Sequence, residues 1–108
     1  MDLRDLQAWI IEHPTEDLSM EALASRVAMS PRNFSRVFVK DVGMTPASFV
    51  ELVRVNAARH KIEQTTMPLK QISDHCGFGN DEQMRRAFQR QLKVSPQAYR
   101  ERFQFQDT

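Results

Sequence analysis

The feature that most restricts how this 108-residue chain can fold is an internal repeat. A shift of 50 residues places the segment 30–49 on the segment 80–99. The matched pairs are apolar, basic, proline and aromatic positions: Phe34/Met84, Val37/Ala87, Phe38/Phe88, Val42/Leu92, Arg36/Arg86, Lys40/Arg90, Pro46/Pro96 and Phe49/Tyr99. Chance similarity between amphipathic helices would reproduce the apolar positions but rarely the prolines and both cations. The repeat therefore predicts two copies of one helix–turn–helix unit.

In the second copy, a GFG sequence at 77–79 leads into a helix expected over 81–92. Glycine reaches positive φ without steric penalty, so we expect both glycines to form a tight turn. Asn80 is a typical N-cap, and Gln83 three residues later completes a capping box. The face opposite the apolar stripe carries Arg86, Gln89 and Arg90. Such a helix suits a DNA major groove, and a solvated amphipathic helix without a partner is the alternative.

Start and stop signals such as Ser30-Pro31, Gly43 and Thr45-Pro46 divide the chain into seven helices. We expect them over residues 3–13, 20–28, 31–42, about 45–65, 69–76, 81–92 and from Pro96 onward. The sequence thus predicts an all-α fold in which two homeodomain-like helix–turn–helix units are joined by a long central helix. In this interpretation one domain covers 1–108, with units at about 5–44 and 66–103 and a linker helix at about 45–65.

The long linker helix matters because of its length. At about 1.5 Å per residue, roughly twenty residues span about 30 Å. Successive major-groove faces on one side of B-DNA lie about 34 Å apart. The expected recognition helices, 31–42 and 81–92, could therefore read successive major grooves. An ordinary long core helix is the simpler interpretation, and the two are compatible.

Net charge of +1 would be unusual for a nucleic-acid binder, but the charge is unevenly distributed. Residues 1–22 carry one base and six acids, a net −5, whereas residues 23–108 carry fourteen bases and eight acids, a net +6. This asymmetry allows a one-sided positive face. No run of 18 apolar residues predicts a membrane span, and the lone cysteine fits a reducing cytoplasm.

Catalytic chemistry is not indicated. His75-Cys76 is the only pair that suggests a metal or a thiol nucleophile, and adjacent helical residues point about 100° apart. Glycine-rich phosphate loops, paired acids and a serine elbow are missing from the sequence, so we expect no enzyme, no metal and no cofactor. The competing class is a helical protein-interaction module. The duplicated outward cations favour DNA, because a protein-docking face more often exposes aromatic or Met anchors.

The segments MSPRNFSRVF and GFGNDEQMRRAFQRQLKVSPQAYR resemble the AraC/XylS family of bacterial transcription regulators, over roughly residues 5–103. The family's DNA-binding domain consists of two helix–turn–helix units joined by a long helix. The GFG…RRAF and MSPRNFSRVF sequences are more similar to those of the GlxA-type branch. Members of that branch carry an amidase-like (PfpI-type) sensing domain before this one.

The resemblance implies which residues contact an operator. Family positions that read bases correspond here to Arg32, Ser35, Arg36, Asp81, Glu82, Gln83, Arg85 and Arg86. We expect phosphate contacts from Asn33, Lys40, Arg90, Ser30, Thr45 and Ser95. Arg36 and Arg86 are the leading base readers, because Arg pairs bidentately with guanine. Asp81 and Glu82 could accept from cytosine amino groups, or simply stabilise the helix start.

Two positions depart from the family pattern. Met84 stands where many members have Phe, and Lys93 stands where glycine is common, so the helix is expected to end differently there. Expected partners are a double-stranded DNA operator, RNA polymerase and an N-terminal sensing and dimerisation domain in a longer parent protein. We expect the isolated domain to be a monomer that binds DNA without an effector.

Overall fold

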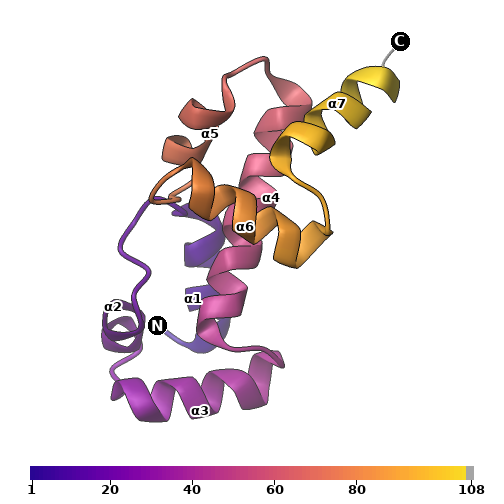
Figure 1. Ribbon diagram of the computed structural model, residues 1–108. Helices are drawn as coiled ribbons and strands as arrows, with labels where there is room; N and C mark the ends of the chain where they lie inside the picture. The colour runs from indigo at the N-terminus through magenta and orange to yellow at the C-terminus, as the bar shows by residue number, and fades with distance from the viewer. Residues whose placement is uncertain (107–108) are drawn as a thin grey trace. The chain divides into compact units, whose positions relative to one another are not determined.

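A computed structural model describes the backbone of residues 1–106 and the side chains of residues 1–103. The described residues form seven helices and no strand, which confirms the predicted all-α class (Figure 1). The helices are α1 Leu3–Glu12, α2 Met20–Arg26, α3 Pro31–Val42, α4 Pro46–Gln64, α5 Leu69–His75, α6 Asp81–Leu92 and α7 Pro96–Gln106.

The chain forms two compact units, Met1–Val53 and Arg54–Thr108, which we call unit 1 and unit 2. The boundary falls inside α4, so each half of this helix belongs to a different unit. Unit 1 consists of α1, α2, α3 and the start of α4, whereas unit 2 consists of the end of α4 with α5, α6 and α7. The end of α4 is thus the first helical segment of unit 2, as α1 is the first helix of unit 1.

The core of unit 1 is built on two aromatic residues of α3. Phe34 and Phe38 are fully buried, with ring centroids 5.5 Å apart, and Phe49 of α4 meets Phe38 edge-on at 5.7 Å. Around them pack Leu6, Ile10, Leu18, Leu23, Ala24, Val50 and Val53. Trp9 lies at the edge of this core, with the Arg26 guanidinium carbon 3.5 Å from its ring centre. The aromatic stripe of α3 therefore determines which side of the helix faces solvent.

The core of unit 2 repeats this arrangement with smaller side chains. Phe88 is fully buried and meets Tyr99 edge-on at 6.3 Å, as Phe38 meets Phe49. The other buried members are Val55, Ala58, Ile62, Ile72, Cys76, Met84 and Ala87. The Tyr99 hydroxyl donates to the carboxylate of Glu63, which joins α7 to α4 within this unit. Burial first, and then this hydrogen bond, raise the pKa of Tyr99 to about 12.

The turns between the paired helices match at the level of single hydrogen bonds. Ala28 adopts φ 56° in unit 1 and Gly77 adopts φ 90° in unit 2. The next backbone N–H then reaches back five residues in both units, from Met29 to Ala24 and from Phe78 to Ser73, at 3.0 Å each. The left-handed Ala28 ends α2 at Arg26, earlier than the expected residue 28. Equivalent turns therefore form whether or not glycine is present.

Gly79 corrects one expectation, since Gly77 is the glycine of the GFG turn with a positive φ. A Cβ built on Gly79 would lie 3.0 Å from Oε1 of Gln83, at the end of a flexible side chain. Asn80 caps α6 by accepting from the Gln83 N–H at 2.8 Å, as the capping box predicts. The turn residues Ala28 and Gly77 are 49 positions apart, whereas the helices that follow them are 50 positions apart. The connection in unit 2 is therefore one residue longer, and Gly79 is the additional residue.

Lys93 gives a second correction. The helix end there was expected to differ because glycine is missing, yet Lys93 adopts the left-handed conformation, φ 60° and ψ 27°. Its counterpart Gly43 has φ 87° and ψ 6°, and both N–H groups return to the carbonyl four residues earlier. A residue with a side chain thus adopts the same turn as glycine despite the steric penalty of that conformation. Both units therefore enter their next helix in the same way.

Candidate nucleic-acid interface

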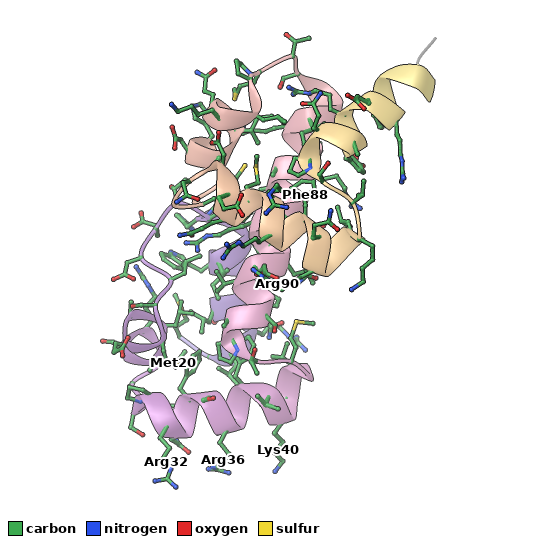
Figure 2. All side chains as sticks on the ribbon, viewed as in Figure 1. Met20, Arg32, Arg36, Lys40, Phe88 and Arg90 are labelled. Carbon is green, nitrogen blue, oxygen red and sulfur yellow. The ribbon has the colours of Figure 1, made fainter. Side chains whose placement is uncertain are left out.

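The solvent face of α3 is basic along its length. Arg32, Arg36 and Lys40 extend from the same side of the helix, opposite the buried aromatic stripe (Figure 2). Nη2 of Arg36 donates to Oδ1 of Asn33 at 2.7 Å, which orients the guanidinium along the helix surface. A hollow of about 290 Å³ at the start of the helix is lined by Ser30, Arg32, Asn33 and Arg36. The structure thus brings together four residues predicted to contact DNA.

The solvent face of α6 combines bases with acids. All five predicted base-contacting residues of this helix are exposed: Asp81, Glu82, Gln83, Arg85 and Arg86. The Glu82 carboxylate accepts from Arg85 Nη2 at 2.5 Å and Nε at 2.9 Å, and from Arg86 Nε at 3.0 Å. These hydrogen bonds from Arg85 and then Arg86 lower the pKa of Glu82 to about 2. Glu82 therefore stays ionised at any pH at which the protein would meet DNA.

The three hydroxyl residues predicted to contact phosphates are all helix caps. Oγ of Ser30, Oγ1 of Thr45 and Oγ of Ser95 each accept from a backbone N–H three residues later, at 3.2, 3.1 and 3.0 Å. A hydroxyl that accepts as a cap keeps its own hydrogen to donate. Each is therefore held at a helix N-terminus, where an anion is favoured by the helix dipole. Ser30 and Thr45 are exposed, whereas Ser95 and the predicted base contact Ser35 are only partly exposed.

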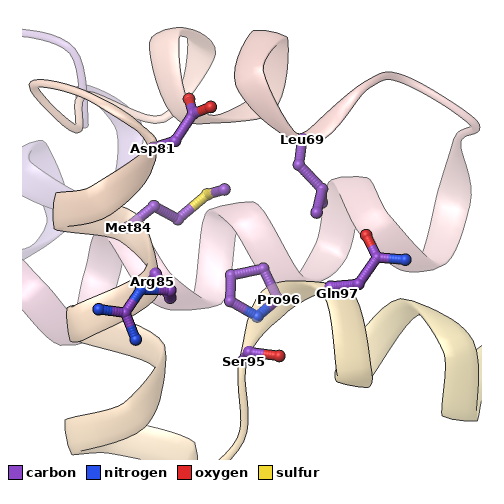
Figure 3. Close-up of a pocket in the computed structure, with 7 residues that line it drawn as sticks. All are labelled: Leu69, Asp81, Met84, Arg85, Ser95, Pro96 and Gln97. Atoms are coloured by element: carbon purple, nitrogen blue, oxygen red, sulfur yellow. The ribbon is translucent and has the colours of Figure 1, made fainter.

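A hollow of about 240 Å³ lies beside α6 in unit 2 and has an apolar floor (Figure 3). It is lined by Leu69, Asp81, Met84, Arg85, Ser95, Pro96 and Gln97. Met84 occupies the position that fully buried Phe34 fills in unit 1. An unbranched thioether has a different shape from a phenyl ring, and Met84 lines the hollow from the position that Phe34 fills in unit 1.

The described residues give little support to a metal site, a reactive thiol or a membrane-spanning helix. They contain no group of three His, Cys, Asp or Glu side chains that could hold a metal ion. Cys76 is fully buried, and that burial raises the pKa of its thiol, so it packs as a small apolar residue. In the described part of the chain, no helix combines the length and the apolar character that crossing a membrane requires.

The arrangement around Glu82 was not foreseen from the sequence, where Glu82 figured only as a base reader or a cap. The signal was present, because Arg85 and Arg86 lie three and four residues after Glu82. Such spacings bring opposite charges together on a helix surface. The missing information was which guanidinium nitrogens take part, and this depends on side-chain rotamers.

Comparison with known proteins gives a family and a fold. A family model described as a helix-turn-helix domain matches residues 23–102. The HTH-type transcriptional regulator Rv1931c of Mycobacterium tuberculosis is 48% identical over 81 residues, covering 75% of this chain and 31% of the relative. The activator RhaS of Salmonella schwarzengrund is 30% identical over 99 residues, covering 92% of this chain and 36% of the relative. The chain thus spans about a third of the length of these relatives.

Among solved structures, this chain is similar to the DNA-binding domain of AdpA, a global transcriptional factor, in complex with a target DNA. The TM-score is 0.91 at 34% identity, and the match covers 96% of this chain and 94% of the other. An AraC-type DNA-binding domain-containing regulator from Chromobacterium violaceum matches with a TM-score of 0.83 at 25% identity, over 94% and 90% of the two chains. Both similarities extend over nearly the whole of the two-unit arrangement.

Proposed function

Since the chain belongs to the AraC-type family of helix–turn–helix transcription regulators, we propose that it binds double-stranded DNA sequence-specifically. In this proposal α3 and α6 lie in successive major grooves of one operator. The family and the fold are those of transcription regulators, which are not enzymes. The observation that carries the proposal is the similarity, at a TM-score of 0.91, to a domain solved on its target DNA.

The repeated chemistry of the two recognition helices supports the same conclusion. Each begins at a side-chain cap, buries one apolar face and exposes an Arg at matched positions, Arg36 and Arg86. We assign these two as guanine readers, because a guanidinium pairs bidentately with O6 and N7. The further proposed base contacts are Arg32, Ser35, Asp81, Glu82, Gln83 and Arg85. The proposed phosphate contacts are Ser30, Asn33, Lys40, Thr45, Arg90 and Ser95.

The biological setting is part of the proposal. We infer a bacterial, cytoplasmic regulator of the GlxA-type branch, on the strength of the MSPRNFSRVF and GFG…RRAF segments. The matched regions make up only 31% and 36% of the two relatives, which supports an additional N-terminal sensing and dimerisation domain. RNA polymerase is a further proposed partner. The 108-residue chain itself is expected to bind as a monomer and without a metabolite.

A spacing experiment tests the two-groove proposal. The preferred duplex is first obtained by selection from random sequence, and five base pairs are then inserted between the two half-sites. Half a helical turn moves one half-site to the opposite side of the duplex, so most of the specific affinity should be lost. The matched control carries the same five base pairs outside the site and should bind unchanged. Binding that is indifferent to the internal insertion would contradict simultaneous reading by two helices.

A further inference from the structure

Glu82 accepts hydrogen bonds from the two arginines that follow it, and these bonds orient both guanidinium groups. Arg85 is held by Nε and Nη2 together, so Glu82 takes the whole side edge of its guanidinium. Arg86 is held by Nε alone, and its terminal nitrogens Nη1 and Nη2 take no part in that bond. One carboxylate therefore holds two neighbouring guanidinium groups in two different ways.

The distinction matters because guanine is bound by one edge of a guanidinium. O6 and N7 accept two parallel N–H donors, supplied by the side edge (Nε with Nη2) or by the terminal edge (Nη1 with Nη2). The carboxylate takes the side edge of Arg85 through two hydrogen bonds. Because Nη1 and Nη2 each carry two hydrogens, the terminal edge of Arg85 can still donate. The terminal edge of Arg86 is likewise available, on a side chain that is 65% exposed. Glu82 thus holds both guanidinium groups from the side and leaves each a terminal edge.

Unit 1 has no carboxylate at the position equivalent to Glu82. The position equivalent to Glu82 is Arg32, so a negative charge is replaced by a positive one. Arg36, the counterpart of Arg86, instead donates through Nη2 to the neutral amide of Asn33. That bond uses one of the two hydrogens of Nη2, so four N–H donors of Arg36 remain for a base. Arg36 is therefore held by a neutral partner, whereas Arg86 is held by a charged one.

We propose that Glu82 is the positioning residue of unit 2: it fixes Arg86 by Nε with the terminal edge available to guanine, and it holds Arg85 by its side edge. This rests on the proposed reading of DNA by α6. A second consequence follows from charge. By adding its negative charge beside two arginines, Glu82 weakens attraction to phosphates at every sequence alike. Specific binding keeps the Arg86 contact, so the ratio of specific to non-specific affinity increases.

Glu82→Gln is the main test, with binding of the 108-residue chain measured on the selected duplex and on a random duplex across a salt series. Loss of the carboxylate should strengthen binding to random DNA and steepen its salt dependence by up to about one unit. The specificity ratio should fall about three- to tenfold, the size expected when an exposed charge pair and one ordered side chain are lost. Glu12→Gln removes the same charge outside both recognition helices and should leave the ratio unchanged.

Glu82→Asp separates positioning from charge. The shorter side chain keeps the negative charge, but its reach to Arg86, four residues later, is reduced. We expect Glu82→Asp to lose base preference at the position read by Arg86 while its salt dependence stays near that of the original protein. If the aspartate variant is as selective as the original, positioning is overturned and charge alone explains the effect.

Double variants identify which arginine reads. Arg86→Ala should abolish one guanine preference, and Glu82→Gln in that background should change base preference no further. Arg85→Ala should keep the preference. Loss of a cytosine preference by Glu82→Gln in the Arg86→Ala background would show that Glu82 reads a base itself. If the unaltered chain prefers no sequence, the proposed function fails and this inference with it; selective binding with an unchanged ratio in Glu82→Gln overturns only the inference.

Discussion

The two units have the same helix–turn–helix fold but differ in what each recognition helix presents. Unit 1 offers Arg32, Arg36 and Lys40 over a core with two buried phenyl rings. Unit 2 offers a carboxylate-bound arginine pair over a core in which Met84 replaces one ring. The fold tolerates both because the exposed face of each helix makes no contribution to its core. Duplication can therefore preserve the scaffold while the two reading surfaces diverge.

The difference suggests unequal roles. The outward face of α3 carries bases without an intervening acid, so it is suited to attract phosphates of any sequence. The outward face of α6 carries Asp81 and Glu82 among its bases, and acids there repel phosphates. We expect unit 1 to contribute more to overall affinity and unit 2 more to selectivity. Each prediction below tests one level of this comparison, beginning with the cores.

The largest effect is expected in the cores. Phe38→Ala and Phe88→Ala each remove a fully buried phenyl ring, and each should destabilise its own unit by about 3–5 kcal/mol. Denaturant unfolding can be followed by Trp9 fluorescence for unit 1 and by residue-resolved hydrogen exchange for both units. Val39→Ala, at an exposed apolar position on α3, is the control and should change little. If either phenylalanine variant lowers the stability of both units equally, the chain unfolds as one cooperative body.

Much of this fold was predictable because local signals and the repeat agree. Ser30-Pro31 starts α3 and Asn80 caps α6 as predicted, and the matched Phe38 and Phe88 are fully buried. Agreement of propensity, capping and patterning is what lets a sequence specify a fold. The α4 helix is harder, because Val53 serves one core and Val55 the other. Val53 and Val55 are two positions apart, so their side chains point about 200° apart around the helix. No single apolar stripe therefore indicates that α4 contributes to two cores.

The remaining misses have physical causes that lie outside local sequence. Gly79 was expected at positive φ, but Gly77 is the glycine of this turn that adopts it, and a Cβ at Gly79 would approach the Gln83 side chain in the next helix. Lys93 adopts a glycine-like conformation despite the steric penalty for a residue with a side chain. The hydrogen bonds that Arg85 and Arg86 donate to Glu82 depend on side-chain rotamers, which sequence spacing alone does not determine. The base and phosphate contacts stay predictions, because they require a DNA partner.

The second effect in size concerns the readers. Arg36→Ala and Arg86→Ala should each lose about 1–3 kcal/mol on the selected duplex and relax the preference at one or two base positions. Arg36→Ala should also weaken binding to random DNA, because it removes one of the three positive charges on the outward face of α3. Lys40→Ala is the matched control on α3. It should weaken all sequences alike and lower the salt slope by about one unit. Unchanged base preference in both arginine variants would rule out their assignment as readers.

The smallest effect concerns the helix ends at Gly43 and Lys93, which share one backbone conformation. A left-handed conformation costs a side-chain-bearing residue about 1 kcal/mol relative to glycine. Lys93→Gly should therefore stabilise unit 2, reduced by the loss of the Nζ bond to the Arg90 carbonyl at 3.3 Å. Lys93→Ala loses that bond but keeps the backbone penalty, so the glycine variant should exceed the alanine variant by about 1 kcal/mol in unfolding free energy. Gly43→Ala should destabilise unit 1 by a similar amount. Equal stability of the two Lys93 variants would mean that the backbone at this position relaxes, and that the two helix ends are less alike than their dihedral angles indicate.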